Sequence, residues 1–404
     1  LIVPGLLLLH LCSEETMALH PELGYFDEGL DLTDPAIYDG SIAKEGIANI
    51  LPPVAYRSRI FSELEDEKVW TRKWCCVGNK NQLSEEGDLL PYTLGNHGIH
   101  VQLNKGQLSG RFNFAQHGGC RFVPAQCQTG KKTKCSYTSC GYSRDRDILK
   151  ISDVDEDTPT LRHFVGDMPE RMLPIRVETW AGRIFVNVDQ NSNTLVEQLS
   201  GLDESANKKL DSFKDLSGFW MPLDGNWKVL MPAIIETIGN ELGLAHHWEE
   251  FSAKKYNKPE APEYLVLNGY RSERPFTLIW IFPNTLIEFS EAFSTTIIVQ
   301  PTGLDEALIR VRFLQDPSAK LIDREFDIYN ALWRDRLEEA NTISIKNHRV
   351  YEAWGTPHSP GTSNEILPKI PSGPGYIFQQ YIINKLLTDY EYVWNAPLYS
   401  NARR

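Results

Sequence analysis

The chain lacks an apolar run long enough to cross a membrane. No stretch among its 404 residues reaches about eighteen apolar residues, which is the length that a spanning helix needs. The apolar start, residues 1–11, is too short for a span and lacks the Lys or Arg that begins a secretory signal. We therefore expect a cytoplasmic protein without a membrane span, in which Met17 is the natural start and residues 1–16 are an upstream extension.

The chain also has fewer basic than acidic side chains. Lys and Arg number 41 against 54 Asp and Glu, which gives a formal net charge of −13. Since an acidic surface repels nucleic acid, we expect no nucleic-acid partner. The sequence has no Walker loop, no Gly-x-Ser-x-Gly elbow and no dinucleotide fingerprint after a strand, which excludes the enzyme classes that use them. A hydrophobic content of 41% is that of a folded protein, and the length suits two domains.

Cysteine is scarce outside one segment. Every cysteine except Cys12 lies within residues 75–140. A secreted disulfide framework would be denser and would belong to a shorter chain, so we expect reduced thiols. Cysteine gathered with histidine indicates metal chemistry or a remnant of it. His97 and His100, on a predicted strand in this segment, are expected at the surface and not on a metal.

Hydrophobic periodicity predicts an arm followed by two domains. Residues 1–60 form an N-terminal extension and arm, residues 61–190 an all-β domain, and residues 191–404 a domain of strands and helices. Strands are predicted from period-two alternation or short apolar runs, and helices from a mostly helical period. The expected strands are residues 99–103, 176–189, 263–267, 277–282, 286–289, 295–300 and 308–314, and the expected helices are residues 62–74, 321–347 and a short one near the C-terminus. An antiparallel sheet wrapped around a long helix is an α+β arrangement.

Several separate segments, in their order along the chain, carry a resemblance to a known family. They include Val69-Trp-Thr-Arg-Lys-Trp, Phe112-Asn-Phe-Ala-Gln-His-Gly-Gly-Cys-Arg-Phe, Cys135-Ser-Tyr-Thr-Ser-Cys-Gly-Tyr, Glu178-Thr-Trp-Ala-Gly-Arg-Ile-Phe-Val-Asn and Asn226-Trp-Lys. They resemble the α subunit of Rieske-type non-haem iron oxygenases, which comprise ring-hydroxylating and quaternary-ammonium oxygenases. The resemblance implies a Rieske-like [2Fe–2S] domain followed by a helix-grip (START-like) catalytic-type domain, with an antiparallel sheet and a long C-terminal helix.

The resemblance also implies where a [2Fe–2S] cluster would be held. The family motif is Cys-x-His and, about seventeen residues later, Cys-x-x-His, so that two thiolates hold one iron and two imidazoles the other. The four positions are occupied here by Ala115, His117, Cys135 and Thr138. Alanine has no donor atom, and a threonine hydroxyl is a poor ligand for an iron–sulfur centre. Cys120 and Cys140 are possible substitute ligands, but both also suit buried small apolar positions.

The mononuclear iron site departs from the family pattern in the same way. The resemblance implies two histidines on one helix, an acid on a later helix and a bridging acid before them. Asn240, His246 and Asn341 fall at the ligand positions, with Glu236 at the place of the bridging acid. A rival alignment takes Glu241 with His246, and His247 beside it is a further possible substitute. An amide is a weaker ligand than a carboxylate and brings no charge to Fe(II), so we expect no metal here.

Losses at both sites together predict a protein without cofactors. The leading hypothesis is a non-catalytic structural or regulatory subunit, a pseudoenzyme, in a trimer-based homo- or hetero-oligomer that could include an active oxygenase paralogue. One alternative is an active oxygenase that keeps a [2Fe–2S] cluster and Fe(II) on non-standard ligands and hydroxylates or demethylates a small organic substrate. The other is a metal-free protein that binds a small molecule in a pocket lined by residues 280–289.

Overall fold

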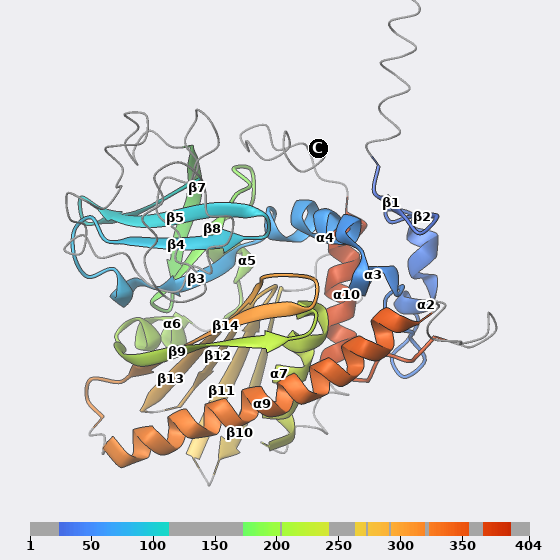
Figure 1. Ribbon diagram of the computed structural model, residues 1–404. Coiled ribbons are helices and arrows are strands. Elements are labelled where there is room, and N and C mark those ends of the chain that lie inside the picture. Colours follow the sequence, from blue (N-terminus) through green and yellow to red (C-terminus); the bar gives the residue numbers. More distant parts are fainter. Residues whose placement is uncertain are drawn as a thin grey trace, which may run out of the picture.

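Two antiparallel sheets and a set of helices packed against them form the frame of the protein (Figure 1). The computed structural model describes residues 24–112, 173–202, 204–241, 263–271, 274–290, 292–319, 323–354 and 367–388. Helices and antiparallel sheets occur together, which confirms the predicted α+β class. Within these ranges no helix is long and apolar enough to span a bilayer.

The first sheet has six strands in the order β3-β8-β7-β6-β5-β4. Its strands are β3 (Cys75–Asn79), β4 (Leu89–Leu94), β5 (His97–Asn104), β6 (Gln107–Phe112), β7 (Pro174–Trp180) and β8 (Arg183–Asn187). Both strand regions predicted here, residues 99–103 and 176–189, are confirmed. The turn between β5 and β6 is made by Lys105 and Gly106, both at positive φ, a conformation that glycine adopts without a steric cost.

The second sheet also has six strands, in the order β10-β11-β12-β13-β14-β9. Its strands are β9 (Lys214–Asp224), β10 (Tyr264–Arg271), β11 (Arg274–Ile281), β12 (Thr285–Phe289), β13 (Phe293–Pro301) and β14 (Glu306–Gln315). The five strands predicted between residues 263 and 314 are confirmed. β9 was not predicted, because only two of its residues, Phe219 and Leu223, are buried.

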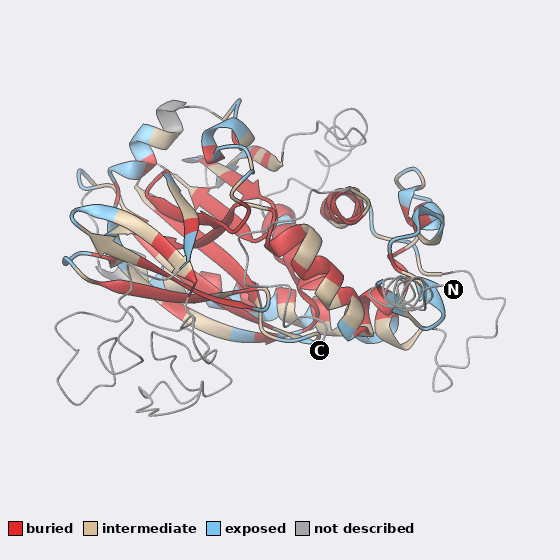
Figure 2. Ribbon diagram, turned by 90° about the horizontal axis from the view of Figure 1, so that it is seen from above, coloured by how far each residue is buried: buried red, intermediate tan, exposed pale blue. Residues whose placement is uncertain are grey.

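Three helices pack on the second sheet and on one another. They are α7 (Trp227–Glu241), α9 (Asp323–Ala353) and α10 (Pro374–Leu386). The long helix α9 confirms the prediction for residues 321–347, and α10 confirms the short C-terminal helix. Figure 2 shows the buried positions concentrated in the sheets and in the helices that cover them. One continuous apolar core therefore runs through both sheets and the helices that pack on them.

The arm and the connections are built from short elements. They are β1 (Phe26–Asp27), β2 (Leu30–Asp31), η2 (Pro35–Tyr38), α2 (Asp39–Ile42), α3 (Val54–Arg57), α4 (Arg59–Glu65), η3 (Asp66–Trp70), η4 (Lys80–Gln82), α5 (Leu195–Gln198) and α6 (Glu204–Asp211). The single helix predicted over residues 62–74 was wrong in its extent. It begins at Arg59, widens to a π-helical turn over Asp66–Trp70 and ends there. The wide turn buries Asp66, Val69 and Trp70 together, which explains why the apolar positions follow the helical period only loosely.

Side-chain hydrogen bonds fasten the first sheet to the second. Asn284, just before β12, accepts from the backbone N–H of Cys76 at 3.1 Å and donates to its carbonyl at 3.0 Å. Arg183 on β8 donates to the Thr296 hydroxyl on β13 at 3.0 Å. These buried contacts fix the two sheets against each other. The limits of the arm and of the two domains, at residues 60 and 190, stay predictions.

Candidate functional site

Helix α7 places the residues that the resemblance assigns to the iron site. The Asn226 side chain caps it by accepting from the backbone N–H of Lys228 at 3.1 Å, and its amide donates to the Leu304 carbonyl at 2.8 Å. Residues on all sides of the helix are buried, from Trp227 to Gly239 with the exception of Glu236. A helix that is apolar all round belongs in the interior, so α7 is held between α9, α10 and the second sheet.

The predicted ligand positions on α7 and α9 differ in environment. Asn240 is exposed near the end of α7, whereas Asn341 on α9 is half-buried. Oδ1 of Asn341 is buried and has no hydrogen-bond partner among the residues that the structure describes. His246 and His247 lie outside the described residues. An unpartnered buried carbonyl oxygen is uncommon in native structures and indicates an unmade contact, such as one with a water or an ion.

Glu241, the rival ligand on α7, is already engaged. Its carboxylate accepts a short hydrogen bond from Nε of Arg336, and Nη1 of Arg336 is 3.1 Å from Oε2 of Glu288. The Arg336 side chain is only 4% exposed and lies over the Trp333 ring at 4.7 Å. Burial opposes the charge, but the two carboxylates raise the pKa of Arg336. Glu241 would have to leave this arginine to bind a metal, so it does not fit a ligand role in this structure.

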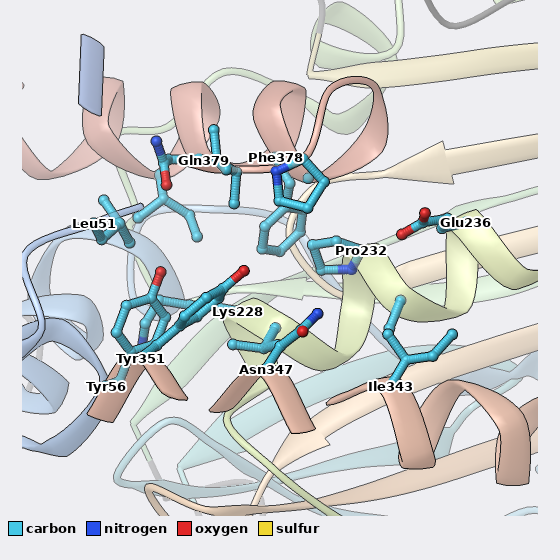
Figure 3. A pocket seen from close by; sticks show the side chains of 16 residues that line it. Leu51, Tyr56, Lys228, Pro232, Glu236, Ile343, Asn347, Tyr351, Phe378 and Gln379 are labelled. Carbon is cyan, nitrogen blue, oxygen red and sulfur yellow. The ribbon is translucent and has the colours of Figure 1, made fainter. Parts of the chain in front are cut away.

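Glu236, the predicted bridging acid, lines a small hollow between α7, α9 and α10 (Figure 3). The hollow holds about 30 Å³ and is also lined by Pro232, Tyr351, Phe378 and Gln379. Burial raises the pKa of Glu236. Burial, together with the nearby Glu236 charge, raises the pKa of Tyr351 to about 12. This is the one sequence-predicted residue that the structure places in a hollow among the described residues.

A buried ion pair beside the hollow was missed at the level of sequence. Nζ of Lys228 lies 2.8 Å from Oε1 of Glu65, and both side chains are almost fully buried. Burial lowers the pKa of Lys228 and raises that of Glu65, and each charge partly offsets the effect on the other. Nζ also lies within 6 Å of the rings of Tyr56, Phe61 and Trp227. The signal for this pair in the sequence is Lys228, a charged residue in the otherwise apolar start of α7.

The predicted cluster positions cannot be placed. Ala115, His117, Cys120, Cys135, Thr138 and Cys140 all lie outside the described residues. Among the residues that the structure does describe, no group of three or more His, Cys, Asp or Glu is arranged to hold a metal. Cys75 and Cys76 on β3 are reduced and buried, and burial raises the pKa of Cys76 to about 12, which leaves the thiol unreactive.

The two histidines on β5 are buried, so their predicted surface location was wrong. Nε2 of His97 is 2.7 Å from Oδ2 of Asp66 in the π-helical turn. His100 is fully buried, and burial, assisted by the Arg111 charge, lowers its pKa to about 3. Alternation along β5 suggested that one face meets solvent, but the first five residues of the strand are all buried.

Comparison with known proteins identifies the relatives of this chain. No protein-family profile matches the sequence. The chain is 24% identical over 287 residues to the carnitine monooxygenase oxygenase subunit of Acinetobacter baumannii, which covers 66% of this chain and 76% of that one. It is 28% identical over 146 residues to the biphenyl 2,3-dioxygenase subunit alpha of Rhodococcus jostii, which covers 36% of this chain and 31% of that one.

Solved structures give the same answer for the fold. The quaternary ammonium Rieske monooxygenase in complex with L-carnitine aligns with a TM-score of 0.57 and 20% identity, over 84% of this chain and 96% of that one. Naphthalene 1,2-dioxygenase with bound indole aligns with a TM-score of 0.53 and 12% identity, over 88% and 95%. By sequence similarity and by fold, the chain is a homologue of the α subunits of Rieske-type non-haem iron oxygenases.

Proposed function

We propose that the chain is an active oxygenase α subunit that acts on a small organic substrate and holds its metals with non-standard ligands. Its relatives are oxygenase subunits, and its likeness to a solved oxygenase covers 84% of this chain. These relatives support the alternative that a [2Fe–2S] cluster and iron are retained, and lend no support to the expected absence of cofactors. The proposal is therefore the second hypothesis drawn from the sequence, not the first.

The observation that carries the proposal is the unpartnered Oδ1 of Asn341. It lies on α9 at the position where the resemblance implies an iron ligand, and it is buried without a hydrogen bond. An amide oxygen can serve as a neutral donor to a metal. We propose that iron would be held by Asn341 together with His246 or His247, and the cluster by His117 and Cys135 with Cys120 and Cys140. Bound there, the two metal groups would supply oxygen activation with electrons from a reductase.

The residues of this chain would contribute position and charge to that site. Arg336 bonds Glu241 and Glu288, so three charged side chains form a network next to the end of α7. This network would orient the end of α7 against α9. Glu236 would lie between the site and a neighbouring subunit, as the resemblance implies for a bridging acid. A related structure is reported with inter-subunit electron transfer, so we propose a trimer-based assembly for this chain as well, in the cytoplasm.

The substrate class follows from the relatives and is proposed, not observed. Solved relatives hold L-carnitine and gamma-butyrobetaine. Both are small zwitterions with a quaternary ammonium group, so quaternary ammonium compounds are the first substrates to test. Aromatic hydrocarbons are the second class, because naphthalene 1,2-dioxygenase shares the fold.

The test is the iron and acid-labile sulfide content of the full chain purified without oxygen, with its visible spectrum. The proposal predicts cluster absorption and iron beyond the cluster content. Asn341→Ala should lose the mononuclear iron and keep the cluster absorption, whereas Thr342→Ala, at the next and exposed position of the same helix, should keep both. Iron and sulfide near zero in the wild-type chain would contradict the proposal.

A second candidate is the non-catalytic subunit, and one observation favours it. The Arg336 guanidinium occupies the exposed Glu241 at the end of α7 and the buried Glu288, where a metal site would need free donors. An arginine that neutralises a buried acid suits a packed interior more than an open site. The same metal measurement separates the two candidates. If the chain holds no metal, the next experiment is co-purification with an oxygenase that keeps the standard ligands.

A further inference from the structure

Two aromatic side chains on α9 lead away from the place where the iron ligands are expected. The first, Trp333, lies eight residues before Asn341, which is about 12 Å along the axis of an α-helix. The Arg336 guanidinium lies 4.7 Å from the centre of the Trp333 ring. The same guanidinium bonds Glu241, the neighbour of Asn240 at the end of α7. These contacts place an oxidisable indole beside the proposed iron site.

The second side chain is Tyr329, one turn before Trp333 on α9. The centroids of the two rings are 6.5 Å apart, and the rings are perpendicular. Trp333 is fully buried, whereas Tyr329 is half-buried and its ring stacks on that of Phe293 at 5.2 Å. The pair therefore runs from the interior towards solvent, and its rings are near enough for an electron to pass between them.

Hydrogen bonding favours the loss of a proton from Tyr329 over its loss from Trp333. The Tyr329 hydroxyl lies 2.7 Å from Oγ1 of Thr295 and donates to Oε1 of Glu288 at 3.5 Å. The other oxygen of that carboxylate, Oε2, is 3.1 Å from Nη1 of Arg336. Nε1 of Trp333 is buried and has no acceptor among the described residues. An oxidised Tyr329 can therefore give its proton to a carboxylate, whereas an oxidised Trp333 keeps its proton.

The charge of Arg336 directs the electron transfer further. A positive charge on the oxidised indole is unfavourable, because the guanidinium lies over the same ring in the protein interior. Oxidation of Tyr329 with loss of its proton leaves a neutral radical and avoids that cost. Packing alone would require neither the phenol hydroxyl nor the carboxylate beside it, since phenylalanine fills nearly the same space.

We propose that Trp333 and Tyr329 form a relay that carries an oxidising equivalent away from the iron site when no substrate takes it up. The relay rests on the oxygenase function proposed above. Trp333 gives one electron to the oxidant at the iron and recovers it from Tyr329. The hydroxyl proton of Tyr329 passes to Glu288, which leaves a phenoxyl radical. A reductant at the surface, a thiolate or ascorbate, then returns one electron, and the proton on Glu288 goes back to the phenol.

The test uses a light-driven oxidant in place of iron, so it does not depend on metal content. Asn240→Cys, labelled with a ruthenium polypyridyl complex, places the oxidant at the exposed end of α7. With a sacrificial electron acceptor in solution, illumination should give the electron paramagnetic resonance signal of a tyrosyl radical, beyond that of the wild type labelled in the same way. Tyr329→Phe or Trp333→Phe, added to this variant, should each abolish the additional signal.

A similar pair elsewhere in the core supplies the matched control. The ring of Tyr381 on α10 lies 5.3 Å from that of Trp280 on β11. Tyr381→Phe, added to the labelled variant, should keep the additional signal. Since Tyr329→Phe removes one oxygen atom and keeps the ring, its circular dichroism should match that of its parent, which separates a lost route from a lost fold.

The possible outcomes separate the relay from the oxygenase proposal. No additional radical in the labelled variant, an unchanged signal after Tyr329→Phe, or its loss after Tyr381→Phe would each overturn the relay, whatever the metal content. In the iron-loaded chain, reduction and exposure to oxygen without substrate should oxidise Trp333 more in Tyr329→Phe than in the wild type, as peptide mass spectrometry measures. Equal oxidation would overturn the protective role. A wild-type chain without iron would overturn the oxygenase proposal and this role with it, even where the radical forms.

Discussion

At the scale of single residues, burial decides the chemistry more than residue type does. His100 and Lys228 are polar residues whose types suggest exposure, yet both are buried. His100 responds by staying neutral, and Lys228 by pairing with Glu65. Arg336 also pairs and stays charged, since it bonds two carboxylates and is stacked over Trp333. The cost of burying each charge is offset only where a partner is within hydrogen-bond distance.

The buried His100 predicts acid sensitivity of the fold. Its pKa is lowered to about 3 in the folded chain, against about 6.5 when unfolded. Between these values the unfolded chain binds the extra proton, so the free energy of unfolding falls as pH falls from about 6.5 towards 3. The contribution is about 1.4 kcal/mol for each pH unit.

Chemical unfolding of the wild type and of His100→Leu at pH 7, 5.5 and 4.5 measures this term. The wild type should lose more stability than His100→Leu between pH 6.5 and 4.5. His348→Leu is a control. His348 is also a buried histidine, but its ring nitrogen lies 3.3 Å from an acceptor, the Tyr56 carbonyl. Parallel pH curves for wild type and His100→Leu would show that this residue does not cause the acid sensitivity.

At the scale of elements, α7 is the helix that joins the features of interest. It carries Glu236 and Glu241, packs against α9 and α10, and is interrupted by Pro232. A proline in a helix interior removes one backbone hydrogen bond and costs about 3 kcal/mol relative to alanine. Pro232 therefore lowers the free energy of unfolding, while its ring lines the hollow.

Pro232→Ala should raise the free energy of unfolding by about 1–3 kcal/mol. The restored N–H can donate to the Lys228 carbonyl, and the smaller side chain widens the hollow. Urea unfolding measures the change, and Pro317→Ala, in an exposed loop, is the matched control with little expected effect. A loss of stability in Pro232→Ala would mean that packing of the ring in the hollow outweighs the restored bond.

At the scale of the whole molecule, the two sheets behave as one frame because buried polar side chains connect them. Asn284 bonds both backbone groups of Cys76, and Arg183 and Gln300 bond strands of the opposite sheet. Such bonds are worth most when neither partner has water to replace it. The candidate site lies on this frame and not on a hinge.

Asn284→Ala should weaken the whole molecule, because it leaves the N–H and the C=O of Cys76 buried and unpaired. The expected loss is about 2–4 kcal/mol in the free energy of unfolding. Differential scanning calorimetry measures it and also reports whether the two sheets still unfold together. Asn268→Ala on the exposed side of β10 is the control. Unchanged stability in Asn284→Ala would show that the two sheets are joined mainly by apolar contacts.

Much of the fold was predictable from local pattern. Period-two alternation located β5, β7, β8 and the strands from β10 to β14, and helical periodicity located α9. β9 was missed because its exposed face hides the alternation, and the helix over residues 62–74 was overextended because a π-helical turn breaks its period. The iron-site positions stay a prediction from the motif, and of these Glu236, Asn240, Glu241 and Asn341 lie in the part of the chain that the structure describes.

The sequence by itself determined the family resemblance and the α+β class, and it predicts that Ala115, Thr138 and Asn341 stand where the family has ligands, because these depend on residue identity and spacing. Only the tertiary structure decided which of these polar groups have partners. It joined Glu241 to Arg336, left Oδ1 of Asn341 and Oε1 of Gln379 without a donor among the described residues, and placed Glu236 in a hollow. The reason is that hydrogen bonding and charge pairing depend on distances between segments that are far apart in sequence, which no local pattern contains.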